Sequence, residues 1–192
     1  MADGPTTASR FARQALENRF NRIVLERLPE LGLPDAWLVA GCLFQTVWNL
    51  RSGFAPDAHI KDYDLFYFDP ADVSEHAEHL VQQRVQALYA DLPITLEAKN
   101  QARVHLWYPA WFGRPYTALA SSREGIDRFL VTCTCVGLAP GAAGPELYAP
   151  HGLAELEAGV LRPNPKCDHR DLFAAKAASY TNRWPWLRIA LP

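Results

Sequence analysis

Two aspartates separated by one residue, Asp62 and Asp64, have the residue type and spacing best suited to chemistry in this sequence. In a β-strand, alternate side chains project from the same face, so a strand through this segment would direct both carboxylates to one side. Two adjacent carboxylates repel each other unless a cation or water lies between them. Because hard carboxylate oxygens suit Mg²⁺ or Mn²⁺, the spacing predicts a divalent metal site.

A glycine-led turn precedes the two aspartates. The apolar run of residues 36–40 is typical of a buried strand, it ends at Gly41, and the apolar spacing of residues 44–50 is helical. Glycine permits close approach of the backbone, and the first N–H groups of a helix have no intrahelical partner. We therefore expect a strand, a tight turn and a helix that bind an anion such as a triphosphate.

These segments resemble the nucleotidyltransferase superfamily, whose pattern is an apolar residue, Gly, then Gly or Ser, a helix, and a strand carrying Asp-x-Asp. More narrowly, the chain resembles a small bacterial nucleotidyltransferase-like family with the polymerase-beta-like fold, over about residues 10–187. The matching segments are AGCLFQTVWNL (40–50), KDYDLFYFD (61–69), KNQARVHLWY (99–108), YAPHGLAEL (148–156) and RPNP (162–165). The resemblance implies that Asp62 and Asp64 hold two divalent metals, which align a nucleoside triphosphate with an acceptor hydroxyl. It also implies that Gly41 and Cys42 form the phosphate turn.

The sequence departs from the superfamily pattern in two places. Cys42 stands where Ser or Gly is usual, and a thiol is a weaker hydrogen-bond donor than a hydroxyl, although the backbone N–H is retained. Nineteen residues separate Cys42 from Asp62, which is longer than usual, and residues 51–59 have the composition of an inserted loop. Such a loop could gate the site or select its substrate.

The resemblance also implies a third carboxylate on a neighbouring strand, as the base or as a ligand of the second metal. Glu97, within the extended-looking residues 94–98, is our candidate. The alternative is a surface glutamate at a strand end, because charged residues are mostly exposed. In that case the site would bind a nucleotide without turning it over.

Two basic residues are candidates for phosphate contacts. Arg103 belongs to the polar residues 100–105 and would share a strand face with Glu97 if no bulge intervenes, although a hydrogen-bonded turn fits the same residues. Lys176, on the predicted last helix, has the reach to meet a triphosphate, although a lone lysine on a helix is usually solvated. The aromatic residues 107–116 could stack a base, with a plain pocket wall or core as the alternative.

Composition restricts the protein class. With 192 residues and 49% hydrophobic content, we expect one domain over residues 8–192, preceded by a flexible tail of residues 1–7. A formal net charge of −2 gives no indication of a nucleic-acid partner, although a polynucleotide acceptor is left open. No apolar run reaches the roughly 20 residues of a membrane span, and no signal peptide is evident, so we expect a cytoplasmic protein. The four cysteines are then free thiols.

Periodicity predicts the elements that position these residues. Helices are expected over residues 11–28, 44–50, 72–90 with Ser74 as N-cap, 122–129, 151–160 and 168–183, and strands at residues 36–40, 62–64, 94–98, 104–108 and 130–138. On the strand of residues 130–138, Cys133 and Cys135 would share one face. Residues 184–187 would end the fold as a hydrophobic clamp.

The expected fold class is α/β, a short mixed sheet of the nucleotidyltransferase type flanked by helices, with accessory C-terminal helices. The expected reaction is Mg²⁺-dependent transfer of a nucleoside monophosphate from a triphosphate to an unknown acceptor hydroxyl, with release of pyrophosphate. Three alternatives stay open. The protein could be a catalytically degenerate nucleotide sensor, or an interaction protein that kept the fold and lost the nucleotide. Finally, Asp62 and Asp64 could form only a solvated strand end, because Asp is common where strands meet loops.

Overall fold

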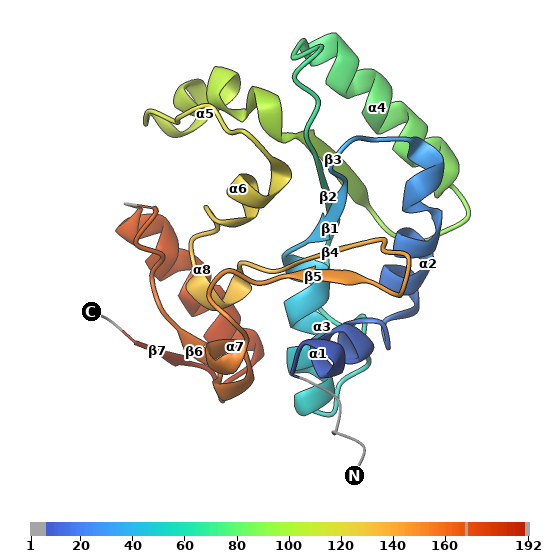
Figure 1. Cartoon of the computed structure of the whole chain (residues 1–192). Helices are drawn as coiled ribbons and strands as arrows, with labels where there is room; N and C mark the ends of the chain where they lie inside the picture. The colour runs from blue at the N-terminus through green and yellow to red at the C-terminus, as the bar shows by residue number, and fades with distance from the viewer. Residues whose placement is uncertain (1–6, 168, 191–192) are drawn as a thin grey trace.

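The computed structural model describes residues 7–167 and 169–190, and a five-stranded mixed sheet lies at its centre (Figure 1). The strand order is β3-β2-β1-β4-β5, in which β2 and β3 are parallel and the other neighbours are antiparallel. The strands are β1 (Trp37–Val39), β2 (Tyr63–Tyr67), β3 (Leu96–Asn100), β4 (Gly137–Ala139) and β5 (Glu146–Tyr148). The fold is therefore the predicted α/β class with a short mixed sheet.

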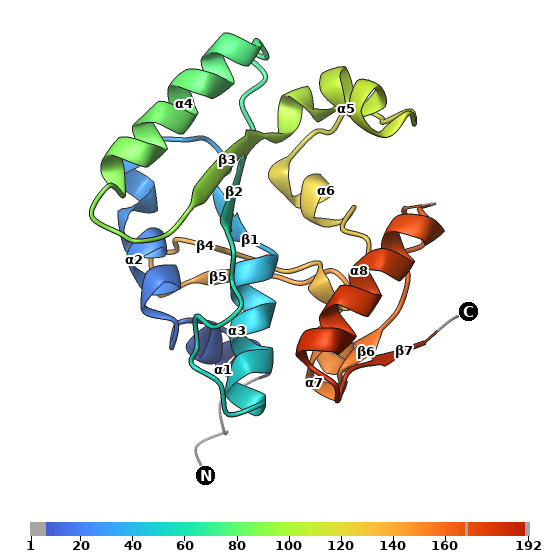
Figure 2. The same cartoon turned by 180° about the vertical axis from the view of Figure 1, so that it is seen from behind.

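Helices cover both sides of this sheet. One side carries α2 (Arg19–Arg27) and α4 (Glu75–Leu88), and the other carries α5 (Val104–Phe112), α6 (Ser122–Ile126) and α8 (Arg170–Arg183), as Figures 1 and 2 show from opposite directions. The helix α1 (Thr7–Ala15) packs on α3 (Gly41–Arg51), while α7 (Ala154–Ala158) lies near the two-stranded sheet of β6 (Val160–Leu161) and β7 (Arg188–Ile189). Three short 3-10 helices complete the described elements: η1 (Leu28–Leu31), η2 (Gln101–Arg103) and η3 (Thr132–Thr134).

Alternation along β2 separates the core from the site. Tyr63, Leu65 and Tyr67 are buried in the main hydrophobic core, whereas Asp64 and Phe66 project from the opposite face and are only partly buried. The register aligns Val39 of β1, Asp64 of β2 and Glu97 of β3 in one row across the sheet.

The predicted hydrophobic clamp at residues 184–187 fixes α8 against α3. Trp184 is fully buried, its ring centroid lies 5.3 Å from that of Trp48, and its indole N–H donates to Asn49 Oδ1 over 3.0 Å. Trp48 in turn donates to the carbonyl oxygen of Leu156 over 3.2 Å. The C-terminal layer is thereby held against the last turns of α3.

The outer side of β3 is occupied by side chains from α4. Gln82 Nε2 donates to the carbonyl oxygen of Leu96, and Gln82 Oε1 accepts from the N–H of Ala98, each over 2.8 Å. Glu78 Oε1 accepts from the N–H of Asn100 over 2.8 Å. These bonds fasten the helix to the strand. The helix begins after the predicted N-cap Ser74, whose hydroxyl accepts from the N–H of Ala77.

The first predicted helix is two helices. Residues 16–18 separate α1 from α2. The buried Asn18 is the N-cap of α2, because its side chain accepts from the N–H of Phe20. The adjacent buried Asn21 donates to the carbonyl oxygens of Ala15 and Cys42 over 2.8 Å and 2.9 Å. Of the expected flexible tail, residues 1–6 lie outside the described residues, and Thr7 is the first residue of α1.

The strand expected at residues 104–108 is wrong, because these residues begin α5. The ladder of β3 ends at Asn100, whose Oδ1 accepts from the N–H groups of Asp69 and Ala102, and the chain turns through η2 into the helix. The apolar and aromatic residues of this segment favour a strand by propensity, but the side chain of Asn100 redirects the backbone.

The strand expected at residues 130–138 is largely wrong, since only Gly137 and Leu138 of that range belong to β4. Thr134 Oγ1 donates to the carbonyl oxygen of Val131 over 2.8 Å and closes the turn η3. Cys133 and Cys135 are buried free thiols as expected, but they pack in different clusters instead of sharing one strand face. The expected helices of residues 122–129 and 151–160 exist in shorter form as α6 and α7.

No helix in the part of the chain that the structure describes has both the length and the apolar character needed to cross a bilayer.

Candidate active site

A cavity of about 300 Å³ lies over Asp64 of β2 and over Asp62, which directly precedes this strand, and we call it the carboxylate cavity. It is formed by the start of α3, the beginning of β2, the helices α5 and α8, and the segment after α6. Its polar lining residues are Gln45, Asp62, Asp64, Tyr108, Arg128, Thr134, Lys176 and Tyr180. The cavity therefore gathers residues that lie more than one hundred positions apart in the sequence.

The glycine turn enters the cavity wall through Ala40 and Gly41. Ala40 has φ 54° and ψ −117°, which makes the turn from β1 into α3 sharp, and its N–H donates to the carbonyl oxygen of Val136 over 3.0 Å. A Cβ atom on Gly41 would lie 2.9 Å from Gln45 Nε2, so glycine allows this close approach. The helix N-terminus, with N–H groups that lack intrahelical partners, is therefore presented at the cavity.

The thiol of Cys42 points into the core and not into the cavity. Its Sγ lies 3.6 Å from the carbonyl oxygen of Val39 within a fully buried setting, and burial raises the pKa of the thiol well above its usual value. The hydroxyl of Thr46 donates to the Cys42 carbonyl over 2.7 Å. Only the backbone N–H of Cys42 is thus suited to the phosphate contact that the resemblance implies.

Negative charge is concentrated at the floor of the cavity. Burial, followed by the neighbouring carboxylates of Asp62 and Glu97, raises the pKa of Asp64 from 3.8 to about 7. Lys176 and Lys99 act in the opposite direction. A divalent cation beside these oxygens would offset the repulsion between the carboxylates.

Glu97 lies next to Asp64 across the parallel ladder, but it is exposed. Its carboxylate is 3.9 Å from the ammonium group of Lys99, and it lines a surface groove between β3 and α4 instead of the carboxylate cavity. Across residues 7–167 and 169–190, no group of three or more His, Cys, Asp and Glu side chains is arranged to hold a metal ion. Asp62 and Asp64 are therefore the central candidate pair, and Glu97 would have to turn toward them.

The structure does not bring Arg103 into the cavity. Because η2 turns the chain after β3, the guanidinium group lies against α4, where Nη1 is 2.5 Å from Glu78 Oε2 and Nε donates to the carbonyl oxygen of Val73. The side chains of Arg103 and Glu78 are only 10% and 14% exposed. This arginine is engaged in a structural ion pair and is not available to a phosphate at Asp64.

Lys176 does line the carboxylate cavity. The helix α8 carries it there, and its ammonium group lies 5.7 Å from the ring centroid of Tyr180. Because the ammonium lowers the pKa of Asp64, its charge acts on the carboxylate pair. A lysine so placed can also bind the phosphate groups of a ligand in the cavity.

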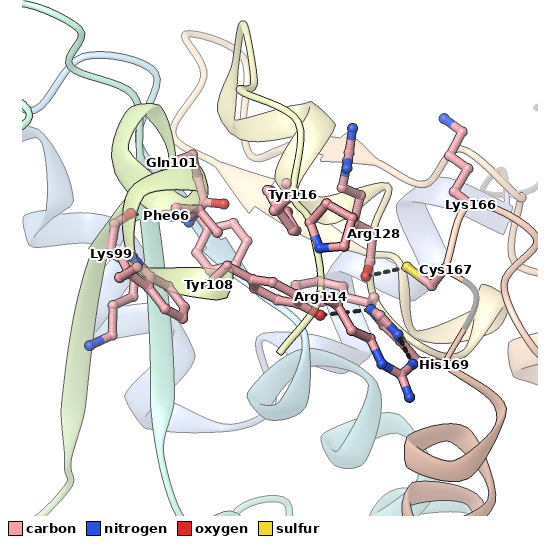
Figure 3. A pocket seen from close by; sticks show the side chains of 15 residues that line it. Phe66, Lys99, Gln101, Tyr108, Arg114, Tyr116, Arg128, Lys166, Cys167 and His169 are labelled. Carbon is pink, nitrogen blue, oxygen red and sulfur yellow. Dashed lines mark hydrogen bonds between the residues drawn. The ribbon is translucent and has the colours of Figure 1, made fainter. Parts of the chain in front are cut away.

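A second cavity, of about 660 Å³, adjoins the first, and we call it the aromatic cavity (Figure 3). Tyr108, Arg128 and Phe129 line both cavities. Its other described lining residues are Phe66, Lys99, Gln101, Val104, Trp107, Arg114, Pro115, Tyr116, Gly125, Lys166, Cys167 and His169. The site thus has one compartment that contains the two aspartates and one lined by aromatic and basic residues, with three described residues lining both.

The family model described as Nucleotidyltransferase matches residues 26–189, which is most of the chain. The chain belongs to the nucleotidyltransferase family. It is also similar to a solved NMR structure described as a CCA-adding enzyme head domain, with 27% sequence identity, a TM-score of 0.78, and coverage of 99% of this chain and 98% of that chain. No curated protein matches the sequence.

Metal-assisted transfer fits the residues of this nucleotidyltransferase. Asp62 and Asp64 offer the hard oxygen ligands that Mg²⁺ and Mn²⁺ prefer, and burial together with the neighbouring carboxylates of Asp62 and Glu97 raises the pKa of Asp64. Asp62 and Asp64 would hold the metal, while the N-terminus of α3 and Lys176 are suited to phosphate groups.

Sequence reasoning missed Arg128, a residue that lines both cavities. It follows a short helix in a segment without a recognisable motif, and only the tertiary structure places it between the two cavities. The aromatic residues 107–116 did provide a signal, since Trp107, Tyr108 and Tyr116 line the aromatic cavity.

Proposed function

We propose that this nucleotidyltransferase transfers a nucleoside monophosphate from a nucleoside triphosphate to an acceptor hydroxyl, with Mg²⁺ or Mn²⁺ at Asp62 and Asp64. One observation carries the proposal. The two carboxylates, the N-terminus of α3 and the ammonium group of Lys176 all line a single cavity. A triphosphate with its divalent cation complements these groups in charge.

In this reaction the acceptor oxygen forms a bond to the α-phosphorus, the bond from that phosphorus to the leaving oxygen breaks, and pyrophosphate departs. The divalent cations, when bound, neutralise the charge on the reacting oxygens and align them. The N–H groups of Gly41 and Cys42 and the ammonium of Lys176 would hold the terminal phosphates. Glu97, adjacent to Asp64 in the ladder, would accept the hydroxyl proton after leaving Lys99.

The test is calorimetric titration of the four ribonucleoside triphosphates, with and without Mg²⁺. We expect the wild type to bind at least one of them only with Mg²⁺, and Asp62→Asn/Asp64→Asn to lose that binding, because the variant lacks the charges that hold the cation. The matched control is Glu17→Gln/Glu26→Gln, which makes the same change of charge at two exposed residues of the α1–α2 region. Absence of nucleotide binding by the wild type under every condition would remove the proposal.

A second candidate is a nucleotide-binding protein that no longer catalyses transfer. The observation in its favour is that Glu97 is exposed and paired with Lys99, outside the carboxylate cavity. This candidate requires Mg²⁺-dependent triphosphate binding without pyrophosphate release for any acceptor, whereas the enzyme releases pyrophosphate and loses that activity in Glu97→Gln.

A further inference from the structure

The aromatic cavity contains a set of rings on which a flat ligand can stack. Tyr108 and Tyr116 have ring centroids 4.4 Å apart with an interplanar angle of 40°, and Phe66 and Trp107 also line the cavity. The hydroxyl of Tyr108 lies 2.8 Å from His169 Nε2, and this contact fixes its ring toward the middle of the cavity (Figure 3). Aromatic platforms of this kind bind nucleobases by stacking.

Among the residues that the structure describes, four cationic side chains line the same cavity. Lys99, Arg114, Arg128 and Lys166 line it, and among its described lining residues none is acidic. This is a local property, because the whole chain has a formal net charge of −2. The combination of stacked rings and cations is complementary to a ligand with a base and a phosphate.

Arg128 is distinguished from the other three cations by its environment. Lys99, Arg114 and Lys166 each lie within 4.0 Å of a carboxylate, those of Glu97, Asp171 and Asp127 respectively. Arg128 has no such carboxylate partner among residues 7–167 and 169–190, and its guanidinium carbon lies 4.7 Å from the ring centroid of Tyr116. Its positive charge is therefore the one most available to a ligand phosphate in the described part of the cavity wall.

We infer that the aromatic cavity is the acceptor subsite and that it takes a phosphate-bearing nucleoside, with the base against Tyr108 and Tyr116 and the phosphate at Arg128. The inference rests on the proposed function. Of the two cavities, Lys99, Arg114 and Lys166 line only the aromatic one, whereas Arg128 lines both. With the triphosphate end of the donor in the carboxylate cavity of about 300 Å³, these cations are placed to serve a second anion beside it. Because Tyr108, Arg128 and Phe129 line both cavities, a ribose hydroxyl of an acceptor bound at their border would lie on the side of Asp62 and Asp64.

The first test measures binding of AMP and of adenosine by calorimetry without divalent cations. The wild type should bind AMP about tenfold or more tightly than adenosine, because of the contact between Arg128 and the phosphate. In Arg128→Gln the two ligands should bind alike. The control Arg123→Gln removes an arginine that is paired with Glu146 and lies outside both cavities, and it should bind as the wild type does.

The stacking role is tested with Tyr108. Tyr108→Phe keeps the ring and Tyr108→Leu removes it, so AMP affinity should fall far more in the leucine variant. Near-ultraviolet circular dichroism of each variant shows whether the fold is intact, and Arg128→Lys supplies a second variant that keeps the charge but loses the planar group. Equal AMP affinity of all these variants and the wild type would overturn the inference, as would absence of AMP binding.

Two further arms separate this inference from the proposed function. Asp62→Asn/Asp64→Asn should lose triphosphate binding and still bind AMP, so loss of AMP binding there overturns the inference. In the wild type with Mg²⁺, a non-hydrolysable triphosphate should leave AMP bound, whereas one-for-one displacement would show that the aromatic cavity holds the donor base. A short single-stranded RNA that binds more tightly than AMP would identify the terminal nucleotide of a strand as the source of the ligand, and equal affinities would identify a free nucleotide.

Discussion

Asp64 shows at the scale of one residue how the site depends on a ligand. Burial, then the charges of Asp62 and Glu97, raise its pKa from 3.8 to about 7. Between these two pH values the folded protein keeps a proton at Asp64 that the unfolded chain has released. The contribution of Asp64 to the free energy of unfolding therefore decreases as the pH rises from about 4 to 7 and stays low above that range.

We predict that Asp64→Asn stabilises the metal-free protein, and that the gain is larger at pH 8 than at pH 5. The amide carries no charge, so it avoids the penalty that the wild-type carboxylate acquires as it ionises. Thermal unfolding in EDTA should show a midpoint several degrees above that of the wild type at pH 8 and a smaller difference at pH 5. The exposed Glu26→Gln is the control, and an equal or reversed pH trend for Asp64→Asn would contradict the prediction.

At the scale of elements, the ion pair of Arg103 and Glu78 joins the end of β3 to α4. Arg103→Ala leaves a largely buried carboxylate without its partner, so we predict a loss of about 3 kcal/mol in the free energy of unfolding, measured in urea. Triphosphate affinity should be unchanged because the guanidinium lies outside the carboxylate cavity. Arg10→Ala, which breaks an exposed pair with Glu157, should cost less than about 1 kcal/mol. If Arg103→Ala lost triphosphate affinity and kept the stability of the wild type, the prediction would be wrong and Arg103 would be a phosphate-binding residue.

The elements also show where sequence reasoning succeeds. The helix α4 begins after its capping Ser74, a local signal that tertiary contacts do not override. The segment from Val104 onward has strand propensity, but the side chain of Asn100 ends the ladder and turns the chain. The resemblance to the nucleotidyltransferase superfamily places Asp62, Asp64 and the glycine turn in one site, whereas Arg128 cannot be placed there from the sequence, because its position results from packing between distant segments.

At the scale of the whole molecule, the position of Lys176 depends on how the C-terminal layer docks. Trp184→Ala removes a fully buried ring and its hydrogen bond to Asn49, so we predict a loss of about 3–5 kcal/mol in the free energy of unfolding. Because α8 would then be less firmly held, triphosphate affinity should fall as well, which calorimetry can measure. Trp111→Ala is the control, since this side chain is 79% exposed and its removal should change neither quantity.

The hydrogen bonds from α4 to β3 have a consequence for association between molecules. An edge strand normally presents a row of unsatisfied N–H and C=O groups that another chain can pair with, which is one route to aggregation. Here the carbonyl oxygen of Leu96 and the N–H groups of Ala98 and Asn100 are already bonded to Gln82 and Glu78. The helix α4 thus occupies the position that a sixth strand would take, so another chain cannot easily add to the sheet at β3. The sheet face from which Asp64 projects is not covered by this helix.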